Sequence, residues 1–459
     1  MTATPLQPGR PRRPERCGRA TPGAALLGAV LAAVLASGCG SSGDAAGGTA
    51  QPAELTEVGW VRSVMKSVYL YADRVPAADL SGLETASQAL EALQVNPPDR
   101  FSYVEKRTTY DGFFDVGTSV GLGIGLRIEA GAVVLRFVLP DSPADRAGLR
   151  RGDRIVSIDG VDIATLVAAG TVTAALGPSE VGLVVRLGWR RDATVTEADI
   201  AKASYTVAPI LASRVIERGA ARIGYVALYT FTETARPAWD AAIAALREAG
   251  ARALVVDLRE NGGGRLYVAA DIAGSLAPRS AVGQTFTELR HNAANLASDL
   301  SITLPARPGT GAFEQVAWLV SDITCSASES LIVGLRPFRD DPLIGTRTCG
   351  KPVGFEPQVR GDVVLSAVSF IGRNRDGLSD WFDGLPPTCT VSAEPYLPFG
   401  DEADPRLAEA LQRLGSGACS PAAQAAQAAQ AAAKSVRTLP SVPTRLPASL
   451  GLASETGLL

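Results

Sequence analysis

The spacing of the apolar residues changes along the chain, and these changes limit the fold more than any other feature. Over residues 54–116 the apolar positions recur at helical spacing. Residues 117–207 consist of short β-runs separated by Gly, Pro and Asp turns. Residues 208–419 alternate strand and helix patterns, which is typical of an α/β core. We therefore predict a small N-terminal helical region, a β-rich module and an α/β core.

Both ends of the chain differ in composition from these regions. Residues 1–39 combine five arginines with a short apolar run that ends in Ala-Ser-Gly-Cys at Cys39, which is the layout of a signal peptide. The small residues before Cys39 resemble the lipobox of bacterial lipoproteins, which implies a lipid on Cys39; an uncleaved anchor is the alternative. Residues 40–53 predict a flexible linker. Residues 420–459 predict a disordered Ala/Gln/Pro tail, with a short alanine helix as the alternative.

Residue counts exclude several site chemistries. The net charge of -3 lacks the basic excess of a nucleic-acid-binding surface, so no nucleic-acid partner is expected. The chain has a single histidine, His291, which excludes multi-histidine zinc sites and most Ser-His-Asp or Cys-His schemes unless His291 is the base. We expect neither a metal nor a cofactor. His291 lies in a polar stretch, and we expect it at the surface.

The cysteines fit an oxidising compartment. Cys17 would leave with the signal peptide and Cys39 would carry the lipid. The remaining cysteines, which allow three pairings, are Cys325, Cys349, Cys389 and Cys419. We predict a disulfide between Cys389 and Cys419, because they bracket the end of the core. The sequence leaves the pairing of Cys325 and Cys349 open.

A glycine-rich run opens the β-rich module. Residues 121–125 read Gly-Leu-Gly-Ile-Gly, and strand cores with Gly-Asp and Asp-Gly turns follow. In this order and spacing they resemble a PDZ domain over nearly its whole length. The resemblance implies that backbone N–H groups at Leu122, Gly123 and Ile124 bind a peptide's terminal carboxylate, while the strand edge pairs with the peptide. A purely structural gate is the alternative.

Two further segments carry groups suited to catalysis. Residues 257–264, Asp-Leu-Arg-Glu-Asn-Gly-Gly-Gly, follow a predicted buried strand and form either a plain tight turn or a nest of amides that stabilises an oxyanion. Ser326 and Glu329 have capping-box spacing, so a helix N-cap without chemistry also explains them. A helix start nevertheless offers the amide of Ala327 to an oxyanion. Lys351 follows Ser326 by 25 residues.

Together, residues 56–419 resemble the carboxyl-terminal processing peptidases, PDZ-containing serine peptidases. The resemblance implies an α/β (α+β) fold: a crotonase-like protease core with an inserted PDZ-like β-rich domain and a small N-terminal helical region. It implies Ser326 as nucleophile, Lys351 as general base, and Gly263 or Gly264 with Ala327 as the oxyanion hole. Protein or peptide C-termini are the expected substrates, and the lipid anchor is the expected link to a membrane. No oligomeric state is implied.

The signal-peptide layout and the lipobox-like residues before Cys39 predict a lipoprotein of the bacterial cell envelope that faces the periplasm or extracytoplasmic space. A lysine in water has a pKa of about 10.4, so Lys351 needs burial or neighbouring positive charge to act as a base. Phe355 stands where the family has a glutamine that orients this lysine, Gln358 is the nearest glutamine, and Cys325 stands where alanine is usual. These departures indicate a divergent branch. A catalytically weakened PDZ scaffold is therefore the alternative function.

Overall fold

The computed structural model describes the backbone of residues 56–436 and the side chains of residues 56–430. The predicted signal peptide and linker, with Cys17 and Cys39, lie outside the described residues, as does the tail beyond residue 436. Within residues 56–436 no helix is both long and apolar enough to cross a bilayer.

The N-terminal region is helical but also contains a strand. Its elements are α1 (Glu57–Ser67), η1 (Ala72–Arg74), α2 (Ala86–Leu93), β1 (Tyr103–Lys106), α3 (Arg107–Asp111) and η2 (Gly112–Val116). The side chain of Thr85 caps α2, and the side chain of Gln88 accepts the Thr85 N–H in return. Strand β1 pairs antiparallel with β19 (Val363–Ser366), which ties this region to the core.

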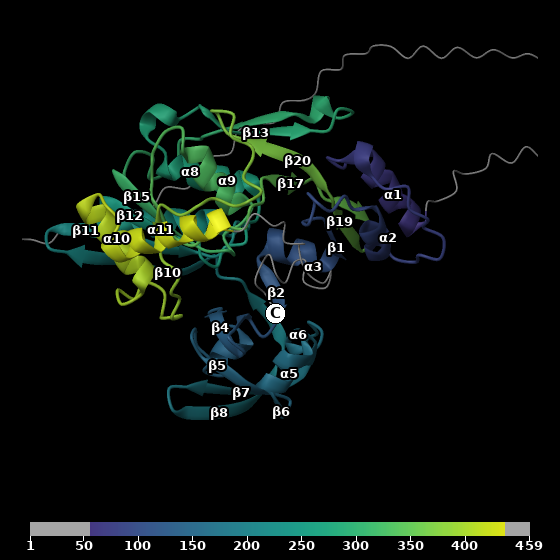
Figure 1. The fold of residues 1–459 in the computed structure, drawn as a ribbon, viewed down its shortest axis with the longest axis horizontal. Coiled ribbons are helices and arrows are strands. Elements are labelled where there is room, and N and C mark those ends of the chain that lie inside the picture. Colours follow the sequence, from purple (N-terminus) through teal and green to yellow (C-terminus); the bar gives the residue numbers. More distant parts are fainter. Residues whose placement is uncertain (1–55, 437–459) are drawn as a thin grey trace, which may run out of the picture. The chain divides into compact units, whose positions relative to one another are not determined.

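The β-rich module forms an antiparallel sheet with the strand order β3-β4-β5-β7-β8. Figure 1 labels its strands β4, β5, β7 and β8. Its strands are β2 (Thr118–Gly121), β3 (Ile124–Glu129), β4 (Ala132–Val138), β5 (Arg154–Ile158), β6 (Val161–Asp162), β7 (Val184–Arg191), β8 (Thr194–Ala201) and β9 (Ala203–Thr206). Its helices are α4 (Pro143–Arg146), α5 (Ile163–Ala169) and α6 (Val172–Ala175). Strands β2 and β9 pair with each other at the two ends of the module. Strand β3 is an edge strand, so its outer edge has no partner within the described residues.

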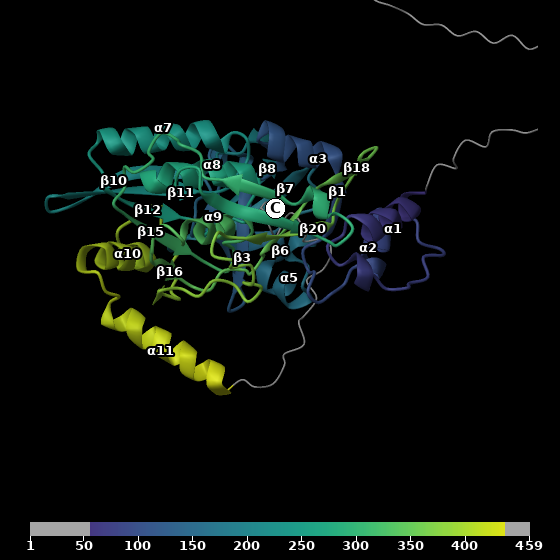
Figure 2. The same cartoon turned by 90° about the horizontal axis from the view of Figure 1, so that it is seen from above.

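The core is built on a sheet with the strand order β10-β11-β12-β15-β16-β21, parallel except for β10. These strands are β10 (Ile210–Arg218), β11 (Ala221–Leu228), β12 (Ala253–Asp257), β15 (Gln315–Val320), β16 (Leu343–Gly345) and β21 (Cys389–Thr390). On one face lie α7 (Ala235–Glu248), α8 (Leu266–Leu276) and α9 (Ala327–Leu335), and on the other α10 (Pro405–Ser416) and α11 (Pro421–Val436), as Figure 2 shows. Two-sided burial explains the continuous apolar runs of β12 and β15.

Two smaller sheets complete the core. The first has the order β14-β13-β20-β17 and the second the order β1-β19-β18. Their remaining strands are β13 (Thr285–His291), β14 (Leu300–Thr303), β17 (Val353–Phe355), β18 (Gln358–Arg360) and β20 (Val368–Arg373). Short 3-10 turns, η3 (Arg279–Ala281) and η4 (Leu296–Ser298), flank β13.

Two predictions need correction. Residues 421–436 form helix α11, so the expectation of a disordered tail from residue 420 is wrong for this part. Alanine and glutamine both favour helix, and Ala423 of α11 packs against the core. His291 is 8% exposed, because it pairs with Phe370 of β20 at the end of β13 and its ring nitrogens contact Asp299 and Glu356, so the expectation of a surface histidine is also wrong.

Candidate active site

The parallel pairing of β12 with β15 brings together the two segments that carry groups suited to catalysis. Asp257 at the end of β12 pairs with Leu319 near the end of β15, so the turns that follow leave the same edge of the sheet. This carboxyl edge is where open α/β sheets hold their sites. Three hydrogen bonds join the two turns: Ser321 Oγ donates to Arg259 O (2.6 Å), Thr324 Oγ1 to Leu258 O (2.8 Å), and the Cys325 N–H to Asn261 O (3.2 Å).

Ser326 has a strained backbone at the start of α9. Its φ of 55° and ψ of -116° are unusual for a residue with a side chain, and such a conformation costs about 1–3 kcal/mol. The same strand-to-helix turn exposes nucleophilic serines in other hydrolases. Ser326 itself is only partly buried, whereas Ala327 and Ser328 beside it are buried.

Gly263 packs directly against Ser326. A Cβ on Gly263 would lie 3.0 Å from the Ser326 Cβ and 3.3 Å from the Ala327 nitrogen, and its φ is +119°. No other residue type fits this position without moving the serine. The Gly263 N–H donates to Asn261 Oδ1 (2.9 Å), whereas the N–H groups of Gly264 and Ala327 have no acceptor among the described residues.

The carboxylate of Glu329 joins the serine segment to the lysine segment. Its Oε2 accepts the N–H of Ser326 (3.1 Å) and of Lys351 (2.8 Å), and its Oε1 accepts the N–H of Gly350 (2.9 Å) and the hydroxyl of Thr348. Burial raises the pKa of Glu329 above its usual value, although these hydrogen bonds oppose the rise. Glu329 is therefore more than the helix cap that its spacing indicates.

Lys351 is buried at 2% exposure between aromatic rings. Its Nζ lies 4.1 Å from the ring centroid of Phe355 and 5.4 Å from that of Phe101. Phe355, at the position of the family's glutamine, thus contacts the lysine through its ring face. Gln358 donates instead to Glu356 O (3.0 Å).

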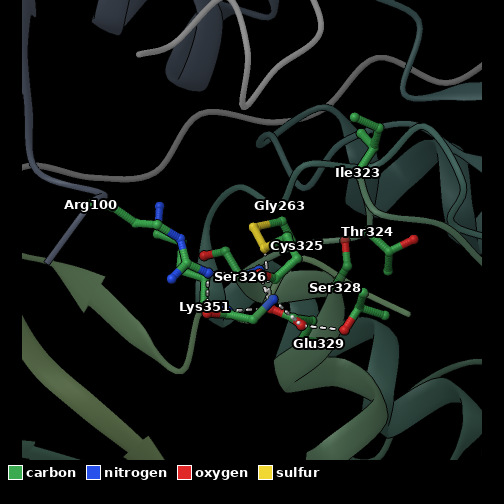
Figure 3. Close-up of a disulfide and its surroundings, with 12 residues drawn as sticks. Arg100, Gly263, Ile323, Thr324, Cys325, Ser326, Ser328, Glu329 and Lys351 are labelled. Atoms are coloured by element: carbon green, nitrogen blue, oxygen red, sulfur yellow. Dashed lines mark hydrogen bonds between the residues drawn. A yellow bond between two sulfur atoms is a disulfide. The ribbon is translucent and has the colours of Figure 1, made fainter. Parts of the chain in front are cut away.

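Both cysteine pairs of the core form disulfides. The structure pairs Cys389 with Cys419, as the sequence favours, and it also pairs Cys325 with Cys349. Figure 3 shows the Cys325 bridge surrounded by Ser326, Glu329 and Lys351. Each cysteine pair lies close enough to a glutamate for the three side chains to hold a metal ion. Sulfur atoms joined in a disulfide are, however, not available as thiolate ligands.

A network of buried charged side chains holds the glycine turn of residues 257–264 in place. Arg259 bonds to Asp257 and to Asp404 (both 2.6 Å), and Asp404 caps α10. Burial acts to raise the pKa of Asp257, but the charge and hydrogen bonds of Arg259 and the Tyr225 hydroxyl outweigh it and hold the pKa below its usual value. The side chains of Asp257 and Arg259 therefore fix the turn by joining it to the cap of α10.

The proposed carboxylate loop lies at the start of the edge strand β3. The side chains of Leu122 and Ile124 are fully buried in the module's core. Gly123 has a φ of +79°, and a Cβ there would lie 2.2 Å from the Ser142 Cβ. The N–H groups of Leu122 and Gly123 have no acceptor among the described residues. Among residues 56–436, the loop therefore presents two donors without an acceptor beside a strand edge without a partner.

Sequence reasoning missed several groups around the lysine. Arg100 donates to Cys349 O (2.9 Å), and Phe101 faces the Lys351 amine. Both come from the N-terminal region, which carries no motif that points to the site. The structure does not bring His291 into this group: its ring nitrogens contact Asp299 (3.3 Å) and Glu356 (3.2 Å).

Three family models match the chain. Residues 222–362 match Peptidase family S41, residues 137–187 match PDZ domain, and residues 58–103 match Peptidase S41 N-terminal domain. The last two lie within the predicted β-rich module and N-terminal helical region, and the first lies in the core.

Curated relatives and solved structures agree with these models. The chain is 29% identical over 234 residues to the carboxyl-terminal-processing protease of Synechocystis sp. (51% of this chain, 53% of that protein), and 34% identical over 166 residues to carboxyl-terminal-processing peptidase 2, chloroplastic, of Arabidopsis thaliana (34% and 32%). The chain spans about half the length of the first of these relatives and about a third of the length of the second. A putative S41 protease from Bacteroides fragilis shares the fold, with a TM-score of 0.64 at 23% identity over 78% of this chain and 97% of that one.

Proposed function

Since this chain belongs to peptidase family S41, we propose that it is a serine endopeptidase that hydrolyses protein substrates captured by their C-termini. One observation carries the proposal: the backbone of Ser326 and the backbone of Lys351 both bond to the same buried carboxylate, that of Glu329. A helix cap alone would bond to Ser326 and would have no reason to hold a buried lysine 25 residues away.

In the proposed reaction Ser326 is the nucleophile and Lys351 the general base. The Lys351 amine takes the hydroxyl proton as Ser326 Oγ attacks the peptide carbonyl, and it returns the proton to the leaving amine. The N–H groups of Gly264 and Ala327 bind the oxyanion, because the Gly263 N–H is already bonded to Asn261. Water, deprotonated by Lys351, then releases the acyl group from Ser326.

The PDZ domain supplies capture of the substrate. We propose that the donors of Leu122 and Gly123, with Ile124 at the start of the strand, bind the terminal carboxylate and that the peptide pairs with the free edge of β3. Two disulfides support an extracytoplasmic location. The lipobox-like sequence supports a lipid anchor at Cys39 in the bacterial envelope.

Cleavage by serine variants tests this proposal. We expect the purified full chain to cleave a reporter protein that ends in an apolar C-terminal tail, and Ser326→Ala to lose at least about 10⁴-fold in kcat. Ser330→Ala is the matched control, because Ser330 lies in the same helix one turn further on; it should keep full activity. A reporter that binds wild type without being cleaved would favour the scaffold instead.

A further inference from the structure

The Cys325–Cys349 disulfide joins the two segments that carry the proposed dyad. Cys325 directly precedes Ser326, and Cys349 lies two residues before Lys351. Their Cα atoms are 5.2 Å apart, although 24 positions separate them in the sequence. The other disulfide of the described residues closes β21 onto the segment between α10 and α11, so it does not touch this junction.

Hydrogen bonds also join the two segments. The Cys349 N–H donates to Thr324 O (3.1 Å), and the Glu329 carboxylate accepts the N–H groups of Ser326, Gly350 and Lys351 and the hydroxyl of Thr348. Each such bond contributes only about 1–3 kcal/mol to holding the geometry. A misplacement of about 1 Å between reacting groups can lower a rate about 100-fold. A covalent bridge at this junction therefore matters to catalysis.

We propose that the Cys325–Cys349 disulfide is the positioning bridge of the dyad, so that peptidase activity depends on its oxidised state. This inference rests on the proposed function. When the bridge is reduced, bonded sulfur atoms become non-bonded ones and must separate, which moves the Ser326 segment away from the Lys351 segment. Cys325 is only 7% exposed. Its side chain therefore has little free space into which it could turn, and the separation of the sulfur atoms must move the backbone.

The reduction is a balanced thiol–disulfide exchange. A thiolate of an external dithiol attacks the sulfur of Cys349, which is the less buried of the two, and Cys325 leaves as a thiolate and takes up a proton. The second thiol of the reductant then displaces Cys349, which is protonated in turn. The protein gains two electrons and two protons, and the reductant closes to its own disulfide.

The test measures kcat and KM of the full chain before and after reduction by dithiothreitol. It uses Cys389→Ser/Cys419→Ser as the matched background, because that variant lacks the other disulfide of the described core; peptide mapping confirms which sulfurs are reduced. We expect kcat to fall about 10- to 100-fold, KM to change less than about twofold, and activity to return on reoxidation. Cys325→Ser/Cys349→Ser should show the low kcat from the start and no response to dithiothreitol.

Three results would overturn the inference. The first is an unchanged kcat after mapping has shown that Cys325 and Cys349 are reduced. The second is a loss of the far-UV circular dichroism signal in step with kcat, since unfolding would then explain the loss. If the serine double variant does not fold, reduction of the native cysteines decides alone. Absence of cleavage by the oxidised chain is a separate, third result, which removes the proposed function and this inference with it.

Discussion

At the scale of single residues, Phe355 replaces a hydrogen-bonding neighbour of the lysine with a ring. Its ring face lies 4.1 Å from Lys351 Nζ and limits where the amine can point. We expect Phe355→Ala to lower kcat about tenfold through loss of this orientation, with KM little changed. Phe355→Tyr keeps the ring and should keep the activity. Equal kcat values for the alanine variant and wild type in the reporter assay would show that the ring does not position the amine.

Glu329 is the residue on which the site's backbone depends. Glu329→Gln places an amide NH₂ among donors that include the Ser326 and Lys351 N–H groups, so at least one buried donor loses its acceptor. We expect urea unfolding to show a loss of about 3 kcal/mol. The control Glu314→Gln, on an exposed glutamate, should change stability by less than about 0.5 kcal/mol. Similar midpoints for the two variants would contradict the assigned role.

Gly263 offers a steric test of the distance between the glycine turn and the nucleophile. Gly263→Ala brings a methyl group to 3.0 Å from the Ser326 Cβ and must displace the serine or the turn. We expect kcat to fall about 100-fold or more. Gly361→Ala also substitutes a glycine of positive φ, but it faces open space and should leave kcat unchanged. Activity retained by Gly263→Ala would mean that Ser326 is not held against this turn.

At the scale of elements, the buried ion pairs join the end of β12 to the start of α10. Because the pKa of Asp257 is lowered in the folded state, the unfolded chain takes up this proton first as the pH falls. The stability that Asp257 contributes is therefore complete above its ordinary pKa of 3.8 and is lost as the pH falls below it. We expect Asp257→Asn to lose about 3–5 kcal/mol at pH 7 and to show a shallower loss of stability in acid; equal unfolding free energies at pH 7 would contradict this.

The sequence predicted the regions of the chain but not the long-range contacts between them. Periodicity identified the helical, β-rich and alternating regions, and the motifs located Ser326, Lys351 and the glycine turn. It missed β1, because the pairing of β1 with β19 is a long-range contact that no local pattern encodes. The polar residues around His291 also indicated a surface position, whereas His291 is buried at the end of β13 beside β20. The roles of Phe101 and Phe355 depend on which ring lies over Lys351, which only the folded chain determines.

At the scale of the whole molecule, capture by the PDZ domain and cleavage by the core are separable steps. Amidation of the reporter's C-terminus removes the carboxylate that the Leu122 and Gly123 donors would bind. We expect KM to rise about tenfold with kcat little changed, because the loss falls on binding alone. A kinetically identical amidated reporter would show that the domain does not bind the terminal carboxylate.

If Ser326 and Lys351 act as nucleophile and base, Lys351→Arg must abolish cleavage. Arginine stays protonated near neutral pH, so it cannot serve as the base. With circular dichroism confirming the fold, we predict reporter cleavage by Lys351→Arg at the background level of Ser326→Ala. The control Lys66→Arg, on an exposed lysine of α1, should cleave like wild type. Cleavage by folded Lys351→Arg above that background would show that Lys351 is not the general base.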